Sequence, residues 1–117
     1  MAAGAYSNGT QWINASSRDY KENIESFETR EALTTLASLD PVKFNYKANA
    51  SEKHVGFIAE DVPDLVATKD RKGLSPMDIV AVLTKVLQEQ QKINQEQLEA
   101  ISNLTKELKE LKRELGR

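Results

Sequence analysis

Residues 75–115, SPMDIVAVLTKVLQEQQKINQEQLEAISNLTKELKELKREL, decide the fold of this chain. Ser75 is a favourable helix cap, Pro76 suits the first helical position, and Asp78 is placed to reach back to the cap. Neither Pro nor Gly follows until Gly116. At 1.5 Å per residue, a helix from Pro76 to Leu115 would be about 60 Å long. We therefore expect a helix that projects from the rest of the chain or pairs with other helices.

This helix carries a 3-4 spacing of apolar residues that is typical of coiled coils. In heptad notation the a positions begin at Val80 and the d positions at Leu83, and the middle of the seam is polar at Gln90, Asn94 and Gln97. The alternative is a single helix that folds back on its own domain, and the mixture of Val, Ile and Leu does not choose between two and three strands. We expect oligomerisation through the apolar members, which are Val80, Leu83, Leu87, Ile101, Leu104, Leu108, Leu111 and Leu115.

A compact region is predicted before the helix. Thr29 is a plausible cap for a short helix with Ala32, Leu33, Leu36 and Leu39 on one face, which we expect to pack. Asp40-Pro41 ends it, because a residue before Pro avoids the helical conformation.

Two strands are expected next. Residues 42–47 alternate apolar and polar side chains, and residues 54–59 form a second apolar run after a six-residue loop. The pattern predicts a β-hairpin, with Gly56 at a bulge or a close backbone approach. The simplest interpretation of the large apolar residues is a core made of Phe44, Tyr46, Phe57 and Leu65.

The predicted fold class is α+β: a small globular domain with a β-hairpin and short helices, followed by a long C-terminal helix that forms a coiled coil. We expect residues 1–15 to be the end of a fibre or a linker, residues 16–75 the globular domain, and residues 76–117 the stalk.

Composition excludes several function classes. The net charge of −2 has both signs mixed along the chain, so we expect neither nucleic acid nor a membrane surface as partner. The chain has no Cys and a single His, His54, so we expect no metal and no cofactor. No apolar run approaches the ~20 residues of a membrane span.

One pair of residues near the N-terminus could take part in catalysis. Ser16 lies five positions before Lys21 in residues 15–24, ASSRDYKENI. A Ser hydroxyl can attack a peptide carbonyl if a neutral Lys amine accepts its proton. By itself the pair is more simply a helix-capping Ser and a surface Lys.

Four motifs in sequence resemble a known family. They are NASSRDYKENI (residues 14–24), LDPVKFNYK (residues 39–47), GFIAEDVPDLV (residues 56–66) and LSPMDIVAVLTK (residues 74–85). Together they resemble the C-terminal intramolecular chaperone and auto-processing domain of phage tailspikes and tail fibres of the endosialidase type.

The resemblance implies a function. Such domains form homotrimers, bring the preceding fibre segment of the same chain into register, and then cut themselves off. It also implies a location in the phage virion tail, as part of a fibre or spike precursor made in the host cytoplasm. The alternative is a non-cleaving trimerisation module of a bacterial surface protein or another fibrous protein.

The family's Ser–Lys peptidase pair maps onto Ser16 and Lys21, which would make the domain a single-turnover enzyme. We expect cleavage at the Ser16–Ser17 bond, with the other side of Ser16 left open. Many family members carry Asp directly after the nucleophile, where this chain has Ser17. Whether this chain cuts itself therefore stays open at the level of sequence.

Overall fold

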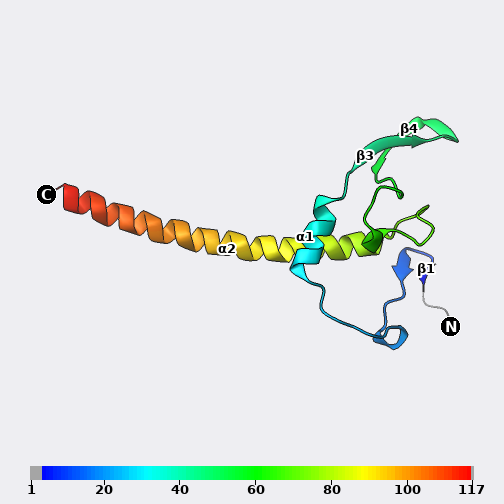
Figure 1. Ribbon diagram of the computed structural model, residues 1–117, viewed down its shortest axis with the longest axis horizontal. Coiled ribbons are helices and arrows are strands. Elements are labelled where there is room, and N and C mark those ends of the chain that lie inside the picture. Colours follow the sequence, from blue (N-terminus) through cyan, green and yellow to red (C-terminus); the bar gives the residue numbers. More distant parts are fainter. Residues whose placement is uncertain (1–3, 117) are drawn as a thin grey trace.

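The computed structural model describes residues 4–116 and is elongated, with extents of 75 × 43 × 30 Å. Residues 1–3 of the predicted fibre end and residue 117 of the predicted stalk lie outside the described residues. A small region of hairpins and short helices surrounds the N-terminal end of one long helix, whose remainder projects away (Figure 1). The predicted α+β fold class is confirmed.

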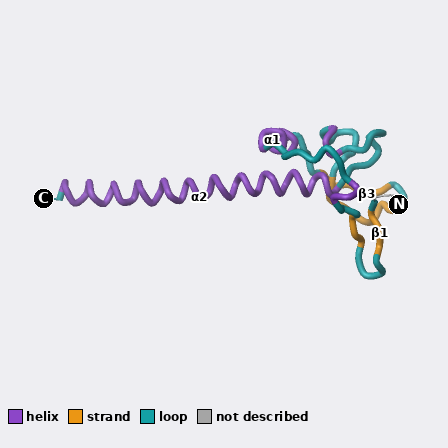
Figure 2. Tube along the Cα trace, turned by 90° about the horizontal axis from the view of Figure 1, so that it is seen from below, coloured by secondary structure: helices purple, strands orange, loops and turns teal. Residues whose placement is uncertain are grey.

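The chain begins with a short antiparallel hairpin of β1 (Ala5–Ser7) and β2 (Trp12–Asn14). Asn8 closes its turn, because its side-chain oxygen accepts hydrogen bonds from the backbone N–H groups of Thr10 and Gln11, both at 3.0 Å. Gly9 adopts a φ of 95°, a conformation that glycine reaches without a Cβ clash. These strands lie on the opposite side of the long helix from the short helix α1 (Figure 2).

The short helix α1 (Thr29–Ala37) begins one residue earlier in the sequence than expected. Glu28 is the cap residue, and Thr29 is already helical. Ala32 and Thr35 are buried, whereas Leu33 is exposed, so the expectation that Leu33 belongs to the packed face is wrong. The packed face consists of the residues that point toward the long helix. Leu33 is next to Ala32 in the sequence and is therefore rotated by about 100° around the helix axis, away from that face.

The second hairpin consists of β3 (Val42–Tyr46) and β4 (Asn49–Gly56). The predicted first strand is confirmed, but the second begins at Asn49 rather than at residue 54 and ends at Gly56. The turn is therefore only residues 47–48, and the polar segment expected as a loop is part of the strand. Its backbone pairs regardless of side-chain polarity, since both faces of this hairpin reach solvent along much of its length.

Gly56 is a close-approach glycine and does not mark the bulge. A Cβ at this position would lie 3.2 Å from the Phe44 ring. The register shift lies instead between Phe44 and Tyr46 on the facing strand. The rings of Phe44, Tyr46 and His54 form a cluster with centroids 5.2–5.8 Å apart. Phe44 and His54 are stacked, and Tyr46 meets both of them edge-on.

The core lies where a short 3-10 helix, η2 (Asp64–Val66), meets the long helix α2 (Pro76–Leu115). Its buried residues are Val62, Val66, Ile79 and Val82, and Phe57 packs against them. Leu65 and Tyr46, which were expected in the core, are exposed. One turn of 3-10 helix directs Val66 inward, and its neighbour Leu65 consequently faces outward.

A clamp holds the segment around η2 against the loop that precedes α2. The Arg71 guanidinium donates to the carbonyl oxygen atoms of Val62 and Glu60 and pairs with the Asp64 carboxylate. Arg71 has a φ of 54°. The backbone also closes this loop, since Thr68 N–H donates to Gly73 at 3.0 Å and Ser75 N–H donates to Val66 at 2.8 Å.

The beginning and end of α2 agree with the predicted bounds. The Ser75 hydroxyl accepts from the Asp78 N–H at 3.3 Å, and Pro76 occupies the first turn. The expected return contact from Asp78 is not needed, because the Ser75 N–H already donates to Val66. In the described part of the chain, no helix is apolar enough over a sufficient length to cross a membrane.

Shortening Val82 to Ala should destabilise the globular region, because Val82 is only 1% exposed and its methyl groups fill the space beside Val62 and Val66. We expect a loss of about 2 kcal/mol in the free energy of unfolding, measured by denaturant titration at fixed chain concentration. Val55→Ala is the matched control, since Val55 is 74% exposed. Equal losses in the two variants would contradict the core assignment.

The segment of residues 60–75, which contains the Arg71 clamp, should become less stable in acid. The hydrogen bond from the Lys72 ammonium lowers the pKa of Glu60 below 4.5, and the hydrogen bond from the Thr68 hydroxyl lowers the pKa of Asp70 below 3.8. A lowered pKa means that each group contributes stability above its ordinary pKa, and that this contribution is lost as the pH falls through the lowered value. We expect the protection of the backbone amides in residues 60–75 against hydrogen exchange, expressed relative to the intrinsic rate at each pH, to fall below about pH 4.5.

Glu60→Gln should reduce this acid sensitivity, because an amide does not titrate. Glu96→Gln on the exposed surface of α2 is the control and should keep the wild-type pH profile. A Glu60→Gln profile identical to that of wild type would show that the Lys72 contact does not support the loop.

Candidate active site

Ser16 lies directly after the last hydrogen bond of the N-terminal hairpin. The register pairs Ala5 with Asn14, and the ladder continues as Ala15 N–H donates to the Gly4 carbonyl at 2.9 Å. The backbone is therefore held up to the residue before Ser16. This arrangement fixes the direction in which the chain enters the candidate site.

A single turn of 3-10 helix, η1 (Arg18–Tyr20), then reverses the chain. The Tyr20 N–H donates to the Ser17 carbonyl at 3.1 Å, and the Lys21 N–H donates to the Arg18 carbonyl at 3.0 Å. This turn brings the fifth residue after Ser16 back beside it. The Lys21 Nζ lies 2.6 Å from the Ser16 Oγ and donates a hydrogen bond to it.

The distance between Nζ and Oγ is within the range needed for direct proton transfer. As an ammonium, Lys21 is the donor and Ser16 is a poor nucleophile. As a neutral amine, Lys21 could accept the hydroxyl proton along the same line while Oγ attacks a carbonyl carbon. The geometry thus provides a nucleophile and a base, and the protonation state of Lys21 decides whether they act.

Both side chains are exposed in the single chain. The Tyr20 side chain lines the same pocket as Ser16, whereas Trp12 is 79% exposed and does not line it.

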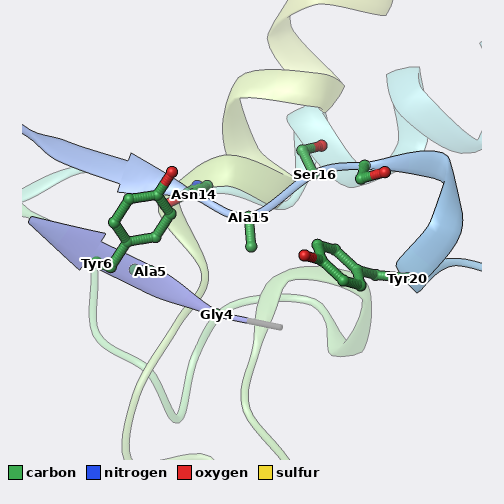
Figure 3. A pocket seen from close by; sticks show the side chains of 8 residues that line it. Gly4, Ala5, Tyr6, Asn14, Ala15, Ser16 and Tyr20 are labelled. Carbon is green, nitrogen blue, oxygen red and sulfur yellow. The ribbon is translucent and has the colours of Figure 1, made fainter. Parts of the chain in front are cut away.

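The pocket beside Ser16 has a volume of about 590 Å³. Its walls come from the two ends of the hairpin and from η1, and Figure 3 shows the Tyr20 ring beside Ala15 and below Ser16. The lining residues are Gly4, Ala5, Tyr6, Asn14, Ala15, Ser16, Ser17 and Tyr20.

The first strand of the hairpin was missed as part of this site. The sequence contained the signal, because the Ser7-Asn8-Gly9 turn lies between two segments with aromatic residues, Tyr6 and Trp12. What the sequence lacked was the register, which decides that Gly4 and Ala5 lie opposite Ala15 and Asn14.

Ser17 has a structural role in the turn. Its hydroxyl accepts a hydrogen bond from the Asp19 N–H at 3.1 Å and caps η1. Ser and Asp are both favourable caps, because each offers an oxygen acceptor on a short side chain. Ser17 therefore retains the capping function that an Asp would have at this position, without its negative charge.

The predicted seam residues lie along α2, and none of them lines the pocket beside Ser16. The buried face of α2 contains Ile79 and Val82, which occupy the g and c positions of the heptad assignment. The a and d residues lie on other faces and are exposed, for example Leu87 at 66% and Leu104 at 63%. In the described residues, no group of three or more His, Asp or Glu side chains is arranged to hold a metal ion.

Comparison with known proteins identifies the segment that contains the pair. Residues 16–69 match the family model Peptidase_S74, described as chaperone of endosialidase. No curated protein and no solved structure matches the chain. The matched segment begins at Ser16, includes Lys21, and ends before α2. Residues 16–69 of this chain therefore belong to the chaperone of endosialidase family.

Proposed function

We propose that this chain is a trimerising intramolecular chaperone that aligns a β-structured fibre segment preceding it in the same polypeptide. The observation that carries the proposal is the exposed apolar seam of α2, on a helix that extends well beyond the globular region it packs against (Figure 1). The family match supports the chaperone role. The virion tail of a phage is the location that fits this role.

The seam supports association because its apolar residues have no cover within the chain. From Ile101 to Leu115 every a and d residue is at least half exposed. Each apolar side chain removed from water in a coiled coil contributes about 1.5–3 kcal/mol when fully buried. The buried face of α2 is used by the globular region, so the seam is left for other copies.

A helical stalk is suited to assist a β-structured client. Strands contributed by three chains make mostly non-local contacts, which form slowly and leave edges exposed to misassembly. Helices form from local contacts, and their association raises the effective concentration of the segments attached to them. In this proposal, residues 1–15 are the end of the client, residues 16–75 the chaperone domain, and residues 76–117 the stalk.

Self-cleavage is the second part of the proposal. Ser16 is the nucleophile and Lys21 the base, and the 2.6 Å contact between them supports these roles. Cutting waits for assembly, because burial of Lys21 at a subunit junction would favour its neutral form. The bond that we assign is Ser16–Ser17: attack of Oγ on its carbonyl carbon expels the Ser17 amine, which takes the proton held by Lys21, and water then hydrolyses the ester.

A non-cleaving trimerisation module of another fibrous protein is the alternative. The exposure of Ser16 and Lys21 in the single chain favours it, as does the replacement of a common family Asp by Ser17. The two candidates share the stalk and differ only in the fate of the bond beside Ser16.

Leu104→Asp or Leu108→Asp should dissociate the stalk, because burial of unpaired carboxylates in the seam costs several kcal/mol. Light scattering at micromolar concentration should give a trimer mass for wild type and a monomer mass for either variant. Asn103→Asp, at an outward c position, is the control and should remain a trimer. Unchanged mass in the Leu variants would refute the heptad assignment, and a monomeric wild type would refute the proposed function.

A chain with its native preceding segment should release residues 17–117, detected by intact mass spectrometry. Ser16→Ala and Lys21→Ala should each reduce the cleavage rate by about 10³-fold or more, since one lacks the nucleophile and the other its base. Ser26→Ala is the hydroxyl control and should be cut normally. Leu104→Asp should also stay uncut if cutting follows assembly. An intact but correctly assembled wild type would select the non-cleaving alternative.

A further inference from the structure

The seam of α2 is interrupted by three amide side chains. Gln90 and Gln97 occupy d positions and Asn94 an a position, and all three are exposed. The Gln90 Nε2 donates to the Asn94 Oδ1 at 2.8 Å. This contact orients the two amides along the helix surface and leaves the Gln90 Oε1 as acceptor and the Asn94 Nδ2 as donor for another molecule.

The surface around these amides is shaped to receive a side chain. Asn94, Gln97, Leu98 and Ile101 line a hollow of about 310 Å³. Four residues around a depression on one helix form the hole that a neighbouring helix fills in knobs-into-holes packing. The hollow lies where the amide section (residues 90–97) meets the apolar block that runs from Ile101 to Leu115. A second copy of this chain is therefore the occupant that matches it.

The closing apolar block cannot by itself fix the alignment of the copies. It consists of Ile101 followed by Leu104, Leu108, Leu111 and Leu115. If one helix slides by a heptad, leucine layers still meet leucine layers, for example Leu104 against Leu111. Three of the five layers of the block keep apolar partners after the slide and two are lost, so the block by itself still forms a seam in the slipped state.

The amides remove this ambiguity. In the aligned state three consecutive layers contain amides only, and each copy offers both a donor and an acceptor to a cyclic arrangement. A slide by one heptad puts Asn94 against Ile101 and Gln97 against Leu104. Buried amides then lack partners, which destabilises the slipped state selectively.

We propose that Gln90, Asn94 and Gln97 determine the axial register between copies of this chain. The inference rests on the proposed oligomerisation and assigns to these residues the alignment on which it depends. A slip of one heptad moves a helix by about 10 Å along the axis. At about 3.3 Å per strand residue, the attached β-segments would be misaligned by about three residues.

Disulfide trapping can test the register, because the chain has no Cys. Two full-length populations, Leu104→Cys and Leu111→Cys, are mixed, unfolded, refolded together and equilibrated in a thiol buffer. Aligned helices place these positions about 10 Å apart along the axis, too far for a disulfide, whereas a heptad slip brings them together. With the native amides we expect Leu104→Cys chains to link to each other and not to Leu111→Cys chains.

The same mixture is then prepared with Asn94→Ile and Gln97→Leu in both populations. We expect the mixed 104–111 product to rise about tenfold or more, because the slipped state no longer buries Asn94 against Ile101 and Gln97 against Leu104 without partners. The thermal midpoint should also rise by roughly 5–10 °C. Gln88→Ala and Gln95→Ala, at outward b positions, form the matched control and should leave the mixed product at its original level.

The outcomes separate the inference from the proposed function. No increase of the mixed product in trimers of the Asn94→Ile and Gln97→Leu chain would overturn the register assignment and leave trimerisation intact. A mixed product already abundant with the native amides would also overturn it. A native chain that stays monomeric in light scattering would overturn both proposals.

Discussion

The packing of Val62 and Val66 against Ile79 and Val82 is the contact on which the rest of the structure depends. It joins the turn around η2 to the first turns of α2, and the Arg71 clamp ties residues 60–64 to the loop before α2. Because so few side chains are fully buried, this small core has little redundancy. It also fixes which face of α2 is turned toward the globular region, and therefore which faces remain for other molecules.

This division of faces links the fold to function. The g and c positions of α2, represented by Ile79 and Val82, serve the intramolecular core, and the a and d positions stay in solvent. A helix that buried its a and d residues against its own domain would have no seam to offer. In our proposal, α2 packs against the globular domain with one face and associates with other copies through another. Alignment of the helices therefore also aligns the domains and the segments that precede them.

The Ser16–Lys21 contact has a different origin, because it is local. A capped turn of 3-10 helix brings the Lys21 Nζ to 2.6 Å from the Ser16 Oγ, although the two residues are five positions apart, and no core residue takes part in this turn. Such a contact can form early and in each chain separately. An assembly-dependent reaction then needs a second condition, and desolvation of the Lys21 amine by neighbouring copies would supply it. In our proposal, each chain supplies the geometry of the pair and assembly supplies the desolvation that permits cleavage.

The sequence alone determined the bounds of the long helix, its N-cap and the family of residues 16–69, because each depends on local spacing or a local motif. The heptad positions stay a prediction, and the structure adds that Ser16 and Lys21 are in contact. Only the tertiary structure decided that Leu33, Tyr46 and Leu65 face solvent, that β4 begins at Asn49, and that Arg71 clamps the loop before α2. These features depend on which segments meet in space. Side-chain periodicity records how a segment could be buried, but the packing partner selects the face and register that are used.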